Sequence, residues 1–221
     1  MIKIENFSFK YKGNDKFALH NINLDIENGA FLGLSGVSGS GKTSLLYACC
    51  GVIPHFYKGD FYGSVTLAGK DTVETPISEL SKIAAIVFED VDSSFACTYP
   101  EDEIVFGLRN FGKSKQEAEE NAAEIMSLFE ISDLRGKLIR SLSGGQKRKV
   151  ALAAAIAVKP QVLLLDEPSG ELDPEAKIQV FELLKKLNED GLTIIVSERN
   201  DKLLHEYAAR QYILKTAEIS E

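Results

Sequence analysis

The stretch Gly36-Val37-Ser38-Gly39-Ser40-Gly41-Lys42-Thr43 decides the fold of this chain. It fits the spacing G-x-x-x-x-G-K-[ST] of a phosphate-binding loop, in which glycines let backbone N–H groups converge on a phosphate. A helix that begins directly after the loop would point its positive end at the same place. In this motif the lysine supplies a cation to the β- and γ-phosphates, and the threonine supplies a hydroxyl to Mg²⁺.

The segments on either side favour this interpretation over a simple Gly/Ser-rich turn. Residues 30–34 form a short apolar run typical of a buried strand, and residues 44–48 predict a helix. The motif requires this strand, loop and helix order. We therefore expect the loop from Gly36 to Thr43, together with Ser44, to bind the phosphates of a nucleotide.

Composition narrows the class of protein. The 221 residues are 44% hydrophobic and 26% charged, which is ordinary for a globular domain. The net charge of −8 argues against sustained binding of nucleic acid, which needs clustered Lys and Arg. Cys49, Cys50 and Cys97 lack metal-ligand spacing with the histidines and are interpreted as reduced thiols in a cytosolic protein. The longest apolar run, residues 151–158, is too short to cross a bilayer, so we expect neither secretion nor a membrane span.

The N-terminal part of the chain has the pattern of strands. Residues 1–34 alternate apolar and polar side chains, which predicts an antiparallel strand set that runs into the strand before the loop. Residues 65–67 and 83–88 predict further strands.

The pattern becomes helical over residues 89–139. Ser114 and Glu117 form a capping box, which predicts the start of a helix. Its expected apolar face consists of Ala118, Ala122, Ile125, Leu128 and Phe129, and its glutamates are expected to face solvent.

The C-terminal part alternates strands with helices. A helix over residues 146–159, a buried strand over 162–165, a helix that starts at Asp173-Pro174, and a strand over 193–196 follow in order. This order predicts an α/β fold with a parallel core sheet. We expect residues 1–88 and 140–221 to form the nucleotide-binding core with an N-terminal antiparallel β-subdomain, and residues 89–139 to form an inserted helical subdomain.

Two acids follow the buried strand Leu163-Leu164-Leu165. Parallel sheets bind ligands at the carboxyl ends of their strands, so Asp166 and Glu167 are expected beside the phosphate-binding loop. Asp166 is predicted to hold Mg²⁺, usually through water, and Glu167 to orient or deprotonate the attacking water.

The segment Leu142-Ser143-Gly144-Gly145-Gln146 points to one family. Ser143 and Gln146 have the spacing of a capping box, and the bare helix N-terminus is also an anion site. A phosphate loop, this segment and the Asp-Glu strand in that order resemble the ATP-binding cassette (ABC) ATPases. The resemblance implies that this signature segment closes on the γ-phosphate of ATP held by a second protomer.

The resemblance extends over nearly the whole chain. It implies that Tyr11 packs against adenine, although an ordinary strand aromatic would look the same, and that residues 169–173, with Asp173, form the D-loop of the family. Residues 53–59 and 101–108 resemble cassettes of energy-coupling factor importers, which take up vitamins and metal ions. The implied cofactors are ATP and Mg²⁺. The implied partners are a second cassette, a transmembrane coupling subunit and a substrate-binding membrane subunit, at the inner face of the cell membrane.

Two positions depart from the family pattern. Glu89 stands where a glutamine usually links Mg²⁺ to the membrane partner, and Arg199 stands where a histidine usually contacts the γ-phosphate. Glutamate can still bind Mg²⁺, so Glu89 stays a candidate metal ligand. We hypothesise that Glu89 and Arg199 form a charge pair and that Arg199 swings to phosphate when ATP binds. The alternative is that the two positions degenerated independently.

The leading functional hypothesis is an importer ATPase subunit with Lys42, Glu167 and Arg199 as catalytic residues. Because Ser143 is intact while Glu89 and Arg199 are unusual, a heterodimer is favoured in which this chain's own site is the slower one. Two alternatives stay open: a non-transport ABC ATPase, and a module that senses ATP without turnover.

Overall fold

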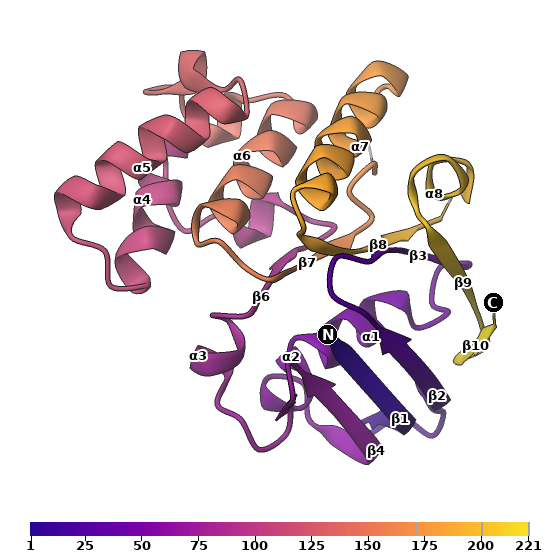
Figure 1. Ribbon diagram of the computed structural model, residues 1–221. Helices are drawn as coiled ribbons and strands as arrows, with labels where there is room; N and C mark the ends of the chain where they lie inside the picture. Colours follow the sequence, from indigo (N-terminus) through magenta and orange to yellow (C-terminus); the bar gives the residue numbers. More distant parts are fainter. Residues whose placement is uncertain (171, 200, 221) are drawn as a thin grey trace.

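Two β-sheets and a group of helices make up the computed structural model, which describes residues 1–170, 172–199 and 201–220 (Figure 1). One sheet is antiparallel with strand order β2-β1-β4-β5, and the other has order β10-β9-β3-β8-β7-β6. The short elements are α2 (Val52–His55), β5 (Lys70–Asp71), α3 (Ile77–Leu80), and the 3₁₀ turns Asp92–Ser94, Ser132–Leu134 and Ile139–Ser141.

The antiparallel sheet is the predicted N-terminal β-subdomain. Its central strand β1 (Ile2–Tyr11) pairs with β2 (Leu19–Ile26) and with β4 (Gly59–Leu67). The buried positions of β1 change parity after Ile4, because a bulge with Asn6 at a φ of 49° shifts the register in both pairings. The bulge lets Phe7 and Phe9 face the core on the same side as Ile4.

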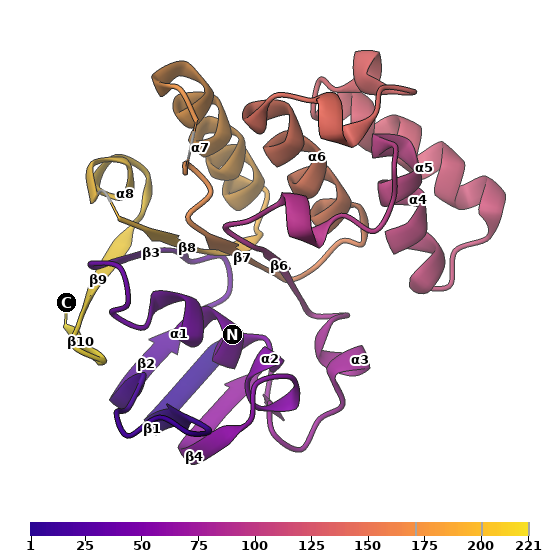
Figure 2. The same ribbon diagram turned by 180° about the vertical axis from the view of Figure 1, so that it is seen from behind.

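The second sheet is the predicted parallel core. β3 (Phe31–Ser35), β6 (Ala84–Val87), β7 (Val162–Asp166), β8 (Thr193–Glu198) and β9 (Arg210–Lys215) run parallel, and β10 (Glu218–Ser220) is antiparallel to β9. Side chains that alternate along β7 and β8 enter two separate cores. One core lies under α6 (Gly144–Ala157), α7 (Pro174–Glu189) and α8 (Asp201–Tyr207), and the other lies around α1 (Lys42–Cys49) and the antiparallel sheet (Figures 1 and 2). Both faces are covered, which explains the continuous aliphatic runs in the sequence.

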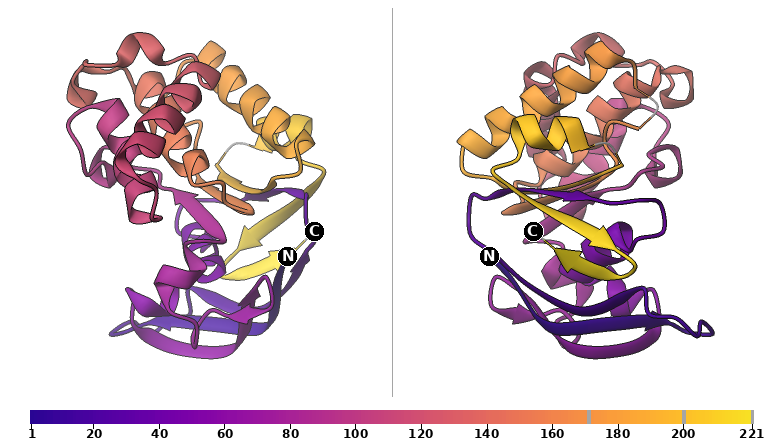
Figure 3. Two further views of the ribbon diagram at one scale, coloured as in Figure 1. Left: turned by 60° about the vertical axis from the view of Figure 1, so that its left-hand side comes forward. Right: turned by 90° about the vertical axis from the view of Figure 1, so that its right-hand side faces the viewer.

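The helices α4 (Pro100–Asn110) and α5 (Lys115–Leu128) pack against each other and against α6, at one side of the core sheet (Figure 3). The capping box of Ser114 and Glu117 is confirmed. One part of the predicted apolar face of α5 is wrong: Leu128 is 59% exposed, and Met126 is buried instead. At 100° per residue, Met126 follows Ala122 by one turn and stays near the buried stripe, whereas Leu128 at the helix end points off its edge.

No helix in the described part of the chain is long and apolar enough to cross a membrane.

Candidate nucleotide site

The phosphate-binding loop lies between the end of β3 and the start of α1, as predicted. Its glycines are needed for steric reasons. A Cβ on Gly36 would lie 2.5 Å from the Leu214 carbonyl oxygen, and a Cβ on Gly41 would lie 2.5 Å from that of Ala18. Gly41 also has a φ of 107°, which only glycine adopts readily. The loop can therefore pass tightly from the strand into α1, whose N-terminal N–H groups suit an anion.

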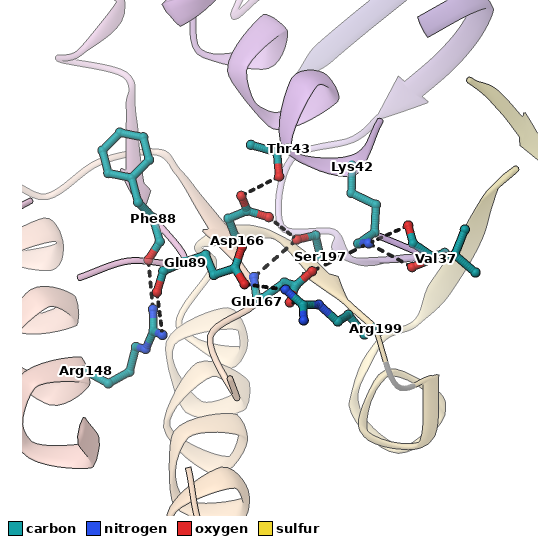
Figure 4. A network of polar contacts seen from close by, with 11 residues as sticks. Val37, Lys42, Thr43, Phe88, Glu89, Arg148, Asp166, Glu167, Ser197 and Arg199 are labelled. Atoms are coloured by element: carbon teal, nitrogen blue, oxygen red, sulfur yellow. Dashed lines mark hydrogen bonds and ion pairs between the residues drawn. The ribbon is translucent and has the colours of Figure 1, made fainter. Parts of the chain in front are cut away.

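Lys42 is the first residue of α1 and is buried, with 4% of its surface exposed. Its Nζ donates to the carbonyl oxygen of Gly36 at 2.8 Å and to that of Val37 at 3.4 Å (Figure 4). Nζ also lies 3.6 Å from Oε1 of Glu167. The ammonium group is thus held at the mouth of the loop, where the motif places the lysine that contacts phosphate.

Thr43 and Asp166 meet beside the loop and form the candidate metal position. Thr43 Oγ1 donates to Asp166 Oδ2 at 2.7 Å, and Ser197 Oγ donates to Asp166 Oδ1 at 2.5 Å. Within the described residues, no group of three or more His, Cys, Asp or Glu side chains is placed to hold a metal ion. This donor set fits Mg²⁺, because Mg²⁺ uses hard oxygens and usually takes only one or two carboxylates, with phosphates and water as its other ligands.

Glu167 follows directly and is held by the end of β8. Its backbone is left-handed, with a φ of 47°, and its N–H donates to the Ser197 carbonyl oxygen at 3.0 Å and to Oγ at 3.2 Å. Two residues later, Ser169 N donates to Oε1 of the buried Glu198 at 2.9 Å. These bonds fix the unusual backbone of Glu167, which costs energy in an L-residue.

The predicted charge pair between Glu89 and Arg199 is confirmed, with Arg199 Nη2 2.5 Å from Glu89 Oε1. The sequence did not predict a second contact: Arg199 Nε lies 2.5 Å from Glu167 Oε2, so one guanidinium bridges two carboxylates (Figure 4). The hydrogen bond to Glu167 and the two negative charges raise the pKa of Arg199. Burial and the charge of Glu167 raise the pKa of Glu89, and Arg199 offsets this only in part.

Tyr11 reaches the loop from the end of β1. Its hydroxyl lies 2.8 Å from Oγ of Ser44, and its ring makes edge contacts with Phe9 and Tyr57. Tyr11 lines a cavity of about 330 Å³ together with most of the predicted phosphate-site residues, which are Ser38, Gly39, Gly41, Lys42, Thr43, Ser44, Glu89, Glu167 and Arg199. The structure therefore brings the predicted aromatic and phosphate positions into one cavity.

The signature segment lies elsewhere. Ser143 caps α6 by the predicted capping box with Gln146, and Asp173 caps α7 by accepting from Ala176 N at 2.9 Å. These two side chains line a separate cavity of about 510 Å³, together with Gly144, Gly145 and Gln146. Ser143 and Asp173 thus lie apart from the cavity of Lys42 and Tyr11, while a third cavity, of about 770 Å³, is lined by Thr43, Glu89 and Asp166 and also by Gly144 of the signature segment. Glu171, which belongs to the predicted segment 169–173, lies outside the described residues.

Sequence reasoning missed three residues that organise the site. Ser197 and Glu198 at the end of β8 hold the Asp166–Ser169 segment, and Arg148 on α6 donates to the carbonyl oxygens of Phe88 and Glu89. A serine or a glutamate at a strand end carries no signal of such a role. Arg148 gave no signal either, because it stands between Lys147 and Lys149 in a run of charged residues.

Fold and site together define a nucleotide-binding α/β protein with a phosphate loop, an acidic strand end and a separate signature segment. The comparisons with known proteins agree. Residues 19–170 match the family model described as ABC transporter. A Pyrococcus abyssi protein named as an ABC transporter ATP-binding protein is 37% identical over 211 residues, which cover 95% of this chain and 75% of the relative. The chain belongs to the ABC transporter ATP-binding family.

Solved structures place the chain among ABC cassettes. CbiO1 of Clostridium perfringens, described as part of the ABC transporter complex CbiONQ, superposes with a TM-score of 0.87 and 26% sequence identity. The match covers the whole of this chain and 86% of the CbiO1 chain. The cassette MJ0796, solved as a dimer in a post-hydrolysis state with ADP and Pi, has a TM-score of 0.86 and 29% identity. The match covers 100% of this chain and 97% of the MJ0796 chain. The predicted ABC ATPase fold is confirmed.

Proposed function

We propose that this chain is the ATPase subunit of an importer of the energy-coupling factor type and works as one half of a cassette dimer. The similarity to CbiO1 and the segments 53–59 and 101–108 support the importer class, and the dimeric MJ0796 supports the second cassette. ATP binding and hydrolysis would drive uptake through a transmembrane coupling subunit, while a separate membrane subunit would bind the substrate. The chain would lie peripherally at the inner face of the cell membrane.

Each group of residues has a distinct role in this proposal. The loop residues and Lys42 would hold the ATP phosphates, and Thr43 and Asp166 would hold Mg²⁺, with Glu89 as a further ligand. Mg²⁺, when bound, would neutralise charge on the phosphate oxygens. Glu167 would accept a proton from the attacking water. Ser143 would meet the γ-phosphate held by the partner cassette, because it lines a cavity separate from the P-loop cavity of its own chain.

One observation carries the proposal that this chain has the slower site of a heterodimer: Arg199 contacts both Glu167 and Glu89. A glutamate that activates water needs an oxygen turned toward that water. Oε2 of Glu167 accepts from Arg199, and Oε1 lies 3.6 Å from Lys42. Water must therefore displace Arg199 before Glu167 can act, and this step slows the site.

The charges of the two departures support a shared role. Relative to the usual glutamine and neutral histidine, Glu89 adds one negative charge and Arg199 adds one positive charge, so the net charge of the pocket is unchanged. The side chains are about half exposed, which makes their pair weak and easily exchanged for a phosphate contact. Independent degeneration would not be expected to conserve charge in this way.

The test uses the complex that an affinity-tagged chain carries from native membranes. We expect a second cassette and a transmembrane subunit to co-purify and the complex to hydrolyse ATP. Glu89→Gln alone and Arg199→His alone should each lower turnover measurably but by less than about threefold, because each leaves one unbalanced charge near the phosphates of the slower site only. The double variant, with the usual family residues, should exceed wild type.

Three outcomes would contradict parts of this proposal. Single variants that leave turnover unchanged, or that raise it additively, would disprove the functional pairing of Glu89 and Arg199. Co-purification with ribosomes or repair proteins, and no membrane subunit, would favour a non-transport ATPase. ATP binding without hydrolysis in every complex would favour a sensor.

A further inference from the structure

Arg148 is a buried arginine on the signature helix α6 that the proposed mechanism does not use. Only 4% of its surface is exposed. Its Nη1 donates to the carbonyl oxygen of Phe88 at 2.9 Å, and its Nη2 donates to that of Glu89 at 3.1 Å (Figure 4). One guanidinium therefore holds two successive carbonyl groups of a segment about sixty residues earlier in the chain.

The segment that Arg148 holds has little regular structure of its own. β6 ends at Val87 and the next 3₁₀ turn begins at Asp92, so the carbonyl groups between them need other donors. Lys147, the neighbour of Arg148, lies 2.7 Å from a carboxylate oxygen of Asp92. Two consecutive residues of α6 thus fix the start and the end of this segment.

Glu89 is held from two sides. Its carbonyl oxygen accepts from Arg148 on α6, and its carboxylate pairs with Arg199, which follows β8 and also contacts Glu167. A continuous chain of contacts therefore runs from the signature helix to the candidate catalytic glutamate. α6 begins one turn before Arg148, with Ser143 as its cap.

We infer that Arg148 is a positioning residue: it sets Glu89 against the P-loop site and so couples the signature helix to the metal-binding side of this chain's own nucleotide. The inference rests on the proposed role of Glu89 as a Mg²⁺ ligand. A shift of α6 on contact with the partner's ATP would move the Glu89 backbone with it. The two nucleotide positions of the chain would then be linked mechanically.

The chemistry explains why an arginine stands here. The planar guanidinium presents several N–H donors in a fixed fork and can bond two carbonyl oxygens at once. A lysine has one nitrogen and could replace only part of this contact. A methionine keeps the length of the side chain but has no donor, so it would release the segment.

The test measures ATP affinity of the purified 221-residue chain, once with saturating Mg²⁺ and once with EDTA. In Arg148→Met the gain in affinity that Mg²⁺ provides should fall about tenfold, the usual effect of removing a residue that orients a metal ligand. Affinity in EDTA should stay within about twofold, because the phosphate loop is untouched. Arg148→Lys should give an intermediate loss.

A matched control and a double variant make the result specific. Arg109→Met removes an exposed arginine that also donates to a carbonyl oxygen, that of Lys113, and should change neither affinity. In a Glu89→Ala background, Arg148→Met should have no further effect on the Mg²⁺-dependent gain. Thermal unfolding of each variant checks that it folds. If Arg148→Met does not fold, the affinity test uses Arg148→Lys in its place.

Three results would overturn the inference: an unchanged Mg²⁺-dependent gain in a folded Arg148 variant, an equal loss in EDTA, or a loss that persists without the Glu89 side chain. None of these depends on turnover or on a membrane partner. A failure of the importer proposal would leave this binding result unchanged, so the two failures can be told apart.

Discussion

The two nucleotide-facing regions of this chain differ in how they are held. At the P-loop end, Asp166 and Glu167 are buried and connected to two other segments, residues 42–43 and 197–199, by hydrogen bonds and ion pairs. At the signature end, the exposed Ser143 side chain contacts only its own capping box among the described residues. The P-loop end is therefore already cross-linked, and in the proposed mechanism Arg199 leaves it before catalysis. The signature end has donors ready for a ligand that another chain supplies.

The largest effect should come from breaking this contrast directly. Ser143→Glu puts an anion where the partner's γ-phosphate would lie, so ATP hydrolysis by the purified complex should fall by about 100-fold or more, the size seen when a stabilising donor is lost. Lys42→Ala weakens only the slower site and should lower hydrolysis by less than about threefold.

Ser127→Glu, an exposed substitution on α5, serves as the control for added charge and should leave hydrolysis unchanged. If Lys42→Ala lowered hydrolysis as much as Ser143→Glu does, both sites would be equally necessary. The heterodimer with a slower site would then be wrong.

The buried connections of the P-loop end should appear in stability. Ser197 is fully buried, donates to Asp166 and accepts from Glu167 N, so Ser197→Ala leaves buried polar groups with fewer partners. We expect the free energy of unfolding in denaturant to fall by about 1–3 kcal/mol. Ser141→Ala, an exposed serine that donates to the Leu138 carbonyl oxygen, should change it by less than about 0.5 kcal/mol. Equal effects would contradict the view that this end is held by its buried network.

Two capping boxes offer a smaller test of the same contrast. Ser114 caps α5 and Ser143 caps α6 by the same geometry, so each serine-to-alanine change should cost about 1 kcal/mol of stability. Only Ser143→Ala should also lower ATP hydrolysis by the complex. If both variants lowered hydrolysis equally, the effect at Ser143 would be one of helix stability, and its proposed contact with phosphate would lose support.

Much of the fold could be predicted from the sequence because its signals are local. The phosphate loop, both capping boxes and the buried strands depend on neighbours in the chain, and each lies where the pattern placed it. The pairing of Glu89 with Arg199 was also predicted, because two departures of opposite charge occurred in loops that converge in the family.

What the sequence did not predict depends on contacts between distant segments. Arg199 reaches Glu167 as well as Glu89, and Arg148 reaches back about sixty residues to the Glu89 backbone. Neither contact has a periodicity or a spacing that marks it. The predicted burial of Leu128 was wrong for a related reason, because the burial of a residue at a helix end depends on which other segments cover that end.

The smallest predicted effect concerns Glu198, a buried carboxylate at the P-loop end with 4% exposure. Burial raises its pKa above the ordinary value of 4.5, although the hydrogen bond from Ser169 N opposes this. The folded chain thus holds the proton more tightly than the unfolded chain. Glu198 therefore stabilises the fold below pH 4.5, and this contribution is lost as pH rises from 4.5 through the raised pKa.

Glu198→Gln removes the charge and keeps an oxygen that accepts from Ser169 N. Its free energy of unfolding, relative to wild type, should rise across this pH window and then stay constant. Glu198→Ala should show the same pH trend but lie about 1 kcal/mol lower at every pH, because Ser169 N loses its acceptor. Denaturant unfolding from pH 4 to 8 without nucleotide measures both. Parallel curves of unfolding free energy against pH for wild type and Glu198→Gln would mean that burial does not destabilise the charged form of Glu198. The P-loop end would then lack the buried charge that distinguishes it from the exposed signature end.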